Sequence, residues 1–82
     1  MDETKIFEQS DLNDALALAI LKDVIESLEK RGYNPINQIV GYLMSGDLGY
    51  ITSFEDARGK IGSIDRSKLL EVLVKQAKKW EY

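Results

Sequence analysis

The sequence predicts an all-α protein, and three observations carry that prediction. Apolar residues recur at the three- and four-residue spacing of a helix surface. No stretch alternates apolar and polar residues for long enough to form a β-strand. Cap residues and glycines divide the pattern into segments. We expect one domain over residues 11–82, a compact bundle of about four short helices, after a flexible N-terminal arm over residues 1–10.

The first predicted helix begins after Asp11 or Asn13, because either side chain can accept hydrogen bonds from the N–H groups of a first turn. Its apolar stripe starts at Ala17, and Gly32 stands where a left-handed C-terminal cap belongs. The N-terminal half of this helix is apolar on nearly every side, since residues 15–19 are all alanine or leucine.

A helix that is apolar all round needs cover on every side, and a chain this short buries only about 60% of its unfolded surface. We therefore expect a homodimer, either intertwined or face to face, with the first helix at the interface. The residues expected there are Leu16, Leu18, Ile20, Leu21, Val24 and Ile25.

The second predicted helix follows Asn34 as its cap and has Pro35 at its first position, where a missing N–H costs nothing. Helical spacing continues to Met44, and residues 45–47 end the helix. Gly41 inside it costs about 1 kcal/mol relative to alanine. A close backbone contact would explain that cost.

Thr52 and Glu55 have the spacing of a capping box, which predicts a short third helix through Ile61. Asp65 is expected to cap a fourth helix, whose last turns carry lysines that suit the negative end of the helix dipole. The apolar stripe expected on this fourth helix consists of Leu69, Leu70, Val72, Leu73, Ala77 and Trp80.

The composition excludes most catalytic chemistry, because the chain has no histidine and no cysteine. It has no imidazole base, no thiolate nucleophile and no ordinary zinc ligand set. The acidic pairs lie in polar stretches or at helix starts, where capping explains them. We expect no enzyme activity, no metal and no cofactor. The longest strongly apolar run, residues 15–21, is far shorter than the roughly 20 residues that span a bilayer, so we expect a cytoplasmic protein without membrane insertion.

Four basic residues gather around the third helix and the start of the fourth. Three interpretations are open for these residues. They are ordinary solvated charge, a docking surface for an acidic partner or a phosphorylated arm, or a contact to nucleic acid. A formal charge of −3 argues against the last interpretation, because duplex binders usually carry excess positive charge. A small helical nucleic-acid-binding module is the alternative function, although we expect no nucleic-acid partner. The four residues are Arg58, Lys60, Arg66 and Lys68.

Thr4 is the candidate modification site in the arm. Its neighbours are Asp2, Glu3 and Lys5, and an accessible threonine in such a segment is open to a kinase. A phosphate there would add about −2 charge.

A dense motif covers residues 31–47, RGYNPINQIVGYLMSGD, and is followed by Gly-Tyr-Ile at residues 49–51 and Ala-Arg at residues 57–58. With these residues the sequence resembles the IreB/ReoM family of small regulatory phosphoproteins of Gram-positive bacteria. The residues that carry the resemblance are Gly32, Tyr33, Asn34, Pro35, Asn37, Gln38, Gly41, Tyr42, Ser45, Gly46 and Asp47.

The resemblance implies a non-enzymatic, all-helical homodimer that a membrane Ser/Thr kinase phosphorylates on an arm threonine, matched here by Thr4. It implies control of peptidoglycan precursor synthesis and cephalosporin resistance, by way of Clp-dependent proteolysis of the enolpyruvyl transferase that commits UDP-N-acetylglucosamine to the wall. The implied partners are the kinase, Clp protease components and that enzyme. Arg58 and Arg66 match arginines of a basic regulatory surface.

Overall fold

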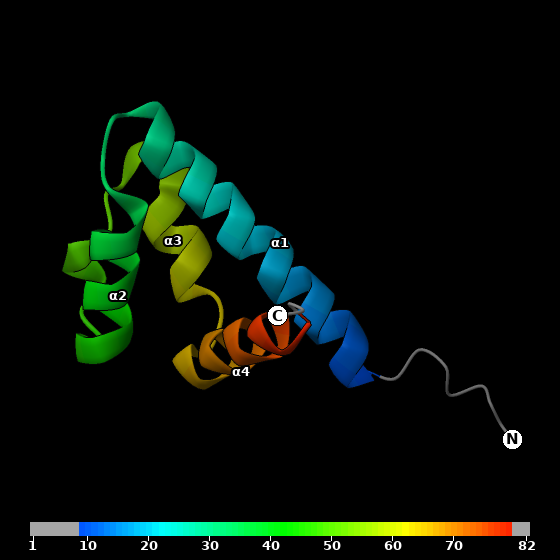
Figure 1. Ribbon diagram of the computed structural model, residues 1–82. Coiled ribbons are helices and arrows are strands. Elements are labelled where there is room, and N and C mark those ends of the chain that lie inside the picture. The colour runs from blue at the N-terminus through cyan, green and yellow to red at the C-terminus, as the bar shows by residue number, and fades with distance from the viewer. Residues whose placement is uncertain (1–8, 80–82) are drawn as a thin grey trace, which may run out of the picture.

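The computed structural model describes residues 9–79, which fold into four α-helices and two short 3₁₀-helices (Figure 1). These residues contain no β-strand, so the all-α prediction is confirmed. In chain order the elements are α1 (Gln9–Lys30), α2 (Pro35–Ser45), η2 (Leu48–Tyr50), η3 (Phe54–Asp56), α3 (Ala57–Gly62) and α4 (Arg66–Lys78).

Helix α1 is the longest element, and α3 and α4 pack most closely against it. Figure 1 shows α3 lying beside it, α4 next to its N-terminal half, and α2 on the far side of α3. The stripe predicted for α1 supplies the centre of the core, since Leu21, Val24 and Leu28 are buried. The other core residues come from α2, α3, α4 and the position directly after η2: Ile39, Tyr42, Ile51, Ala57, Ile61 and Leu69.

Helix α1 starts earlier than the cap residues predicted. It begins at Gln9, so Asp11 and Asn13 lie within its first turns instead of ahead of them. Nothing in this polar stretch interrupts helical hydrogen bonding, and an acidic residue is favoured in a first turn by the helix dipole. The rest of the predicted arm, residues 1–8, lies outside the described residues.

Helix α2 has the two ends that the sequence predicts. The side chain of Asn34 accepts a hydrogen bond from the Asn37 N–H at 3.1 Å, and Pro35 occupies the first helical position. Gly46 ends the helix in the left-handed conformation with φ 78°, and its N–H donates to the Tyr42 carbonyl at 2.7 Å. Both ends follow from local chemistry, because each cap bonds to residues within four positions of itself.

The capping box predicted at Thr52 and Glu55 is wrong. The Thr52 hydroxyl accepts from the Phe54 N–H at 3.3 Å, which forms a turn. α3 itself begins only at Ala57, after the separate 3₁₀-helix η3. Glu55 does not reach back to Thr52, because its carboxylate bonds to side chains of α1 instead.

Glu55 fastens η3 to α1 at a strained position. Its carboxylate accepts from the Ser27 hydroxyl at 2.6 Å and from the Lys30 ammonium at 2.9 Å. The Ser27 side chain is buried, so this bond satisfies a polar group inside the core. Glu55 and Asp56 both have positive φ, 54° and 59°, which is unfavourable for residues with a Cβ. The bonds to α1 oppose that strain.

Helix α4 begins after Asp65 as predicted, but only part of its expected stripe is buried. The Asp65 carbonyl, not its side chain, accepts from the first turn. Leu69 and Val72 are buried against α1, whereas Leu70 and Leu73 are 47% and 37% exposed. Ala77 is exposed and Trp80 lies outside the described residues. α2 and α4 thus stand apart and leave apolar side chains between them.

Gly41 has the close contact that its helical position suggests. A Cβ built on it would lie 2.5 Å from Cδ1 of the Tyr50 ring. Gly41→Ala is therefore expected to destabilise the fold, because overpacking costs about 1–3 kcal/mol against a propensity gain of about 1 kcal/mol. In a Tyr50→Ala background the same change is expected to stabilise it. Urea denaturation of the four proteins measures both effects, and destabilisation of similar size in both backgrounds would contradict the contact.

Candidate functional site

Four charged side chains join the N-terminal half of α1 to α4. We call Asp14, Lys68, Glu71 and Lys75 the α1–α4 charge cluster. Asp14 accepts from Lys68 at 2.8 Å and from Lys75 at 2.6 Å, one lysine on each carboxylate oxygen. Glu71 contacts the same two ammonium groups at 3.0 and 2.9 Å. The four charges therefore form a closed ring in which each group has two opposite partners.

Hydrogen bonds from Lys68 and Lys75 lower the pKa of Asp14, and those from Lys75 and Lys68 lower the pKa of Glu71. Asp14 raises the pKa of Lys75 in return, together with Glu71. The Asp14 side chain is only 19% exposed, so solvent screens this cluster less than it screens the Lys60–Asp23 pair, where Asp23 is 50% exposed.

A depressed carboxyl pKa makes stability depend on pH in a definite direction. The contribution is present above the unfolded value of about 4 and is lost as the pH falls through the lower folded value. Asp14→Asn is therefore expected to lower the melting temperature at pH 7, by an amount that shrinks as the pH falls through the lowered pKa of Asp14. Circular dichroism melts from pH 2 to 7 measure the difference in melting temperature between the wild-type chain and the variant. Asp23→Asn is the control, and its difference at pH 7 should be smaller. If the difference for Asp14→Asn does not shrink at low pH, the Asp14 carboxylate does not stabilise the fold in this way.

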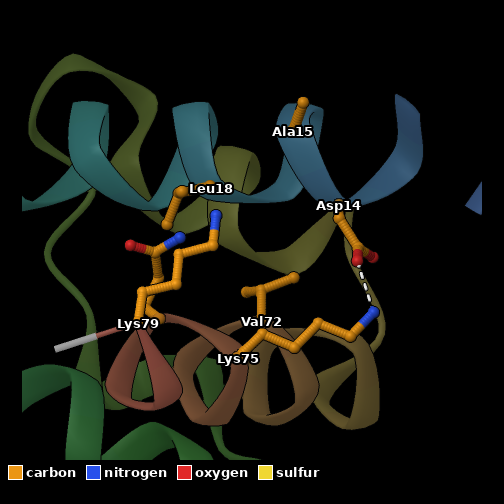
Figure 2. A pocket seen from close by; sticks show the side chains of 7 residues that line it. Asp14, Ala15, Leu18, Val72, Lys75 and Lys79 are labelled. Atoms are coloured by element: carbon orange, nitrogen blue, oxygen red, sulfur yellow. Dashed lines mark hydrogen bonds and ion pairs between the residues drawn. The ribbon is translucent and has the colours of Figure 1, made fainter. Parts of the chain in front are cut away.

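A cleft of about 440 Å³ opens beside the charge cluster, between α1 and α4. Figure 2 shows Lys75 extending to Asp14 and Lys79 extending toward α1 beside Leu18. The other residues that line the cleft are Ala15, Val72 and Gln76. The cleft thus combines an apolar floor with ammonium groups at its edge.

The structure does not bring the four predicted basic residues to one common partner. Arg58 Nε donates to the Ile51 carbonyl at 2.9 Å, and Arg66 donates to the Leu43 carbonyl at 3.0 Å. Lys60 pairs with Asp23 at 2.7 Å, in the middle of α1, and Lys68 belongs to the α1–α4 charge cluster. Two of the four charges are thereby matched by carboxylates, which weakens any role of this set in nucleic-acid binding.

The residues predicted for a dimer interface divide into two groups. Leu21 and Val24 are buried in the chain's own core, and Ile20 and Ile25 pack against that core. These four side chains are therefore used within one copy of the chain, in or against its own core. Leu16 is 59% exposed, and the half-buried Leu18 lines the cleft, so these two have surface left for a partner.

The structure also has a second and larger exposed apolar surface, which the sequence does not predict. A groove of about 310 Å³ lies between α2 and α4, floored by residues such as Leu21 and Ile25 of α1, and Glu29 is the one ionisable group in its lining. Exposed apolar side chains line or flank it at helical spacing. We call this set the α2–α4 face: Ile36, Val40, Met44, Leu70, Leu73 and Val74.

The motif of residues 31–47 builds turns. Gly32 has φ 82°, which a glycine adopts without strain, and the chain reverses there from α1 to α2. Gln38 accepts from the Thr52 N–H at 3.1 Å, and Asp47 accepts from the Gly49 N–H at 2.8 Å. Ser45 donates to the Gly41 carbonyl and accepts from the Asp47 N–H. The remaining motif residues lie in α2, at its caps, or beside Gly32, so the motif mainly specifies the α1–α2–η2 path.

Nowhere in residues 9–79 do three potential metal ligands of the histidine, cysteine or carboxylate type come together. Over the same residues, each helix is too short or too polar to serve as a membrane span. Thr4 lies outside the described residues.

The fold and the site define a small all-helical protein whose notable features are a charge cluster, a cleft edged by lysines and an exposed apolar face. A comparison with models of known protein families matches residues 2–78 to the IreB regulatory phosphoproteins. The match covers nearly the whole chain, so the protein belongs to the IreB family, which is regulatory and non-enzymatic. The family predicted from the motif is confirmed.

Proposed function

We propose that this protein is a dimeric regulator that a Ser/Thr kinase switches by phosphorylating Thr4. The observation that carries the proposal is the family match to regulatory phosphoproteins, which runs from residue 2 to residue 78 and so includes Thr4. A phosphate on Thr4 adds about −2 charge to a segment that already holds Asp2 and Glu3. Such a change alters which charged surfaces the segment can contact.

The regulated process is the supply of peptidoglycan precursors in the cytoplasm, and with it tolerance of cephalosporins. The chain acts through protein contacts, by controlling Clp proteolysis of the enolpyruvyl transferase at the entry of the pathway. Support comes from the family and from the character of the described surface, which offers apolar and charged contacts suited to protein partners.

The second copy of the chain covers the α2–α4 face. Ile36, Val40 and Met44 recur every four residues and form one ridge along α2, with exposures of 72%, 45% and 82%. Two residues of the ridge, Ile36 and Val40, also line the apolar groove. A two-fold axis therefore lets each copy present a ridge and receive one, which is the self-complementary arrangement of symmetric dimers. Burying these side chains removes apolar surface that one copy leaves in water.

A reconstituted proteolysis assay tests the regulatory part of the proposal. Purified Clp protease and the enolpyruvyl transferase are incubated alone, with the unmodified chain, and with the chain phosphorylated on Thr4. We expect the chain to change the rate of degradation of the transferase severalfold, and phosphorylation to abolish or invert that change. Equal rates in all three mixtures would refute the proposed link to Clp.

A further inference from the structure

The cleft between α1 and α4 has more ammonium groups at its edge than carboxylates. Its lining includes two ammonium groups, those of Lys75 and Lys79, and one carboxylate, that of Asp14, while Glu71 pairs with Lys75 from the same helix. Each ammonium has three N–H donors. Asp14 and Glu71 take two of those of Lys75, which leaves its third N–H for another acceptor without breaking either bond.

An anion carried by the arm of the same copy reaches this cleft easily. Thr4 precedes the first helical residue, Gln9, by five residues, so an extended arm spans at most about 17 Å from there. Asp14 lies five residues into the helix, about 7.5 Å along its axis. Lys75 contacts Asp14 directly, so the arm covers this distance with slack. Figure 1 shows the same proximity, with the red end of α4 beside the blue turns of α1.

The basic group nearer the middle of the molecule, Lys60, lies beyond that reach. Lys60 binds Asp23, which is fourteen residues beyond Gln9 and thus about 21 Å along α1. An arm that doubled back along the helix, even fully extended, would fall short of it. The Arg66 guanidinium points toward the C-terminal end of α2, where it bonds the Leu43 carbonyl.

We propose that phosphothreonine 4 docks in the α1–α4 cleft, where its phosphate oxygens accept hydrogen bonds from the ammonium groups of Lys75 and Lys79. The ligand is a phosphomonoester dianion of the chain itself. The inference rests on the proposed function in taking Thr4 as the phosphorylated residue. Docking ties the arm to the crossing of α1 and α4 through charge-assisted bonds, which are shorter and stronger than neutral ones. In the unmodified chain, the threonine hydroxyl has no charge to hold it there.

Phosphorus NMR on the full chain tests the docking. Phosphothreonine is placed at position 4 by genetic encoding, so the measurement needs no kinase and stands even if the kinase assignment fails. Ammonium partners favour the dianion, so we expect the second phosphate pKa to lie about 0.5 below that of a phosphopeptide of residues 1–10. The difference should vanish in Lys75→Gln/Lys79→Gln, survive in Lys75→Arg/Lys79→Arg, and survive in Lys60→Gln.

Results that differ from these expectations overturn the inference. A phosphate pKa equal to that of the peptide in the wild-type chain shows an undocked arm. A lowered pKa that persists in the Lys75→Gln/Lys79→Gln variant, or that disappears in Lys60→Gln, places the phosphate elsewhere. Circular dichroism establishes that each variant is folded, and the arginine variant separates loss of charge from loss of fold. Failure of the kinase to modify Thr4, measured separately, would refute the proposed function alone.

Discussion

Ile36→Glu is expected to separate two copies of the chain while leaving each copy folded. Ile36 is 72% exposed and lies in the first turn of α2, which has no acidic residue. A glutamate there interacts favourably with the helix dipole, so the single copy becomes slightly more stable. In the dimer, the same carboxylate would enter an apolar groove without a partner, at a cost that weakens association on the order of 100-fold. Sedimentation equilibrium measures the change in dissociation constant.

Two further variants make this result specific. Asn37→Glu adds the same charge one residue along in the same turn, but Asn37 does not line the groove, so its dimer should be intact. Leu16→Glu tests the interface predicted from the sequence, on the N-terminal half of α1. If Leu16→Glu separates the copies and Ile36→Glu does not, the interface lies on α1. If the wild-type chain is monomeric at high micromolar concentration, the dimer itself is refuted.

A second readout follows from mass action. The melting temperature of a dimer rises with protein concentration, because dissociation accompanies unfolding. The wild-type chain and Asn37→Glu should show that dependence, and Ile36→Glu should melt at a temperature independent of concentration. This comparison also shows how much of the stability of so small a chain comes from pairing.

Local chemistry explains why α2 could be predicted almost to the residue. Asn34, Pro35 and Gly46 act on N–H and carbonyl groups within a few positions of themselves, so their effect can be read without knowing the fold. Thr52 and Glu55 have an equally good local pattern, yet Glu55 bonds Ser27, 28 residues away. A buried hydroxyl that needs a partner outweighs a capping bond that water can replace.

The candidate site was less predictable for the same reason. Lys68 was singled out as part of a basic group, but its partner Asp14 is 54 residues distant, and Lys75 is 61 residues from the same carboxylate. The sequence explains the lysines in the last turns of α4, Lys75 among them, only through the helix dipole. The α2–α4 face was hidden because Leu70 and Leu73 have core-like spacing, and only the separation of α2 from α4 leaves them exposed.

Thr4→Ala is expected to remove all phosphate that the kinase transfers to this chain. The chain contains two threonines, Thr4 and Thr52, and they differ in setting. Thr52 is half-buried and its hydroxyl accepts from the Phe54 N–H, which fixes it in a turn between η2 and η3. A kinase must draw its substrate residue into an extended strand of several residues, and residues 52–56 could enter only if the bond from Glu55 to Ser27 broke. Thr4 lies outside the described residues, and the bonds that hold Thr52 and Glu55 in place do not involve it.

Incubation with a purified kinase domain and intact mass measurement give the stoichiometry directly. The wild-type chain and Thr52→Ala should each take up one phosphate, and Thr4→Ala should take up none. Thr4→Ser should restore the phosphate, because a Ser/Thr kinase accepts either hydroxyl, and this variant shows that Thr4→Ala lost the acceptor and not the docking of the kinase. A full equivalent on Thr4→Ala would mean that a serine or Thr52 is the acceptor, and the regulatory phosphate would then lie on the folded domain.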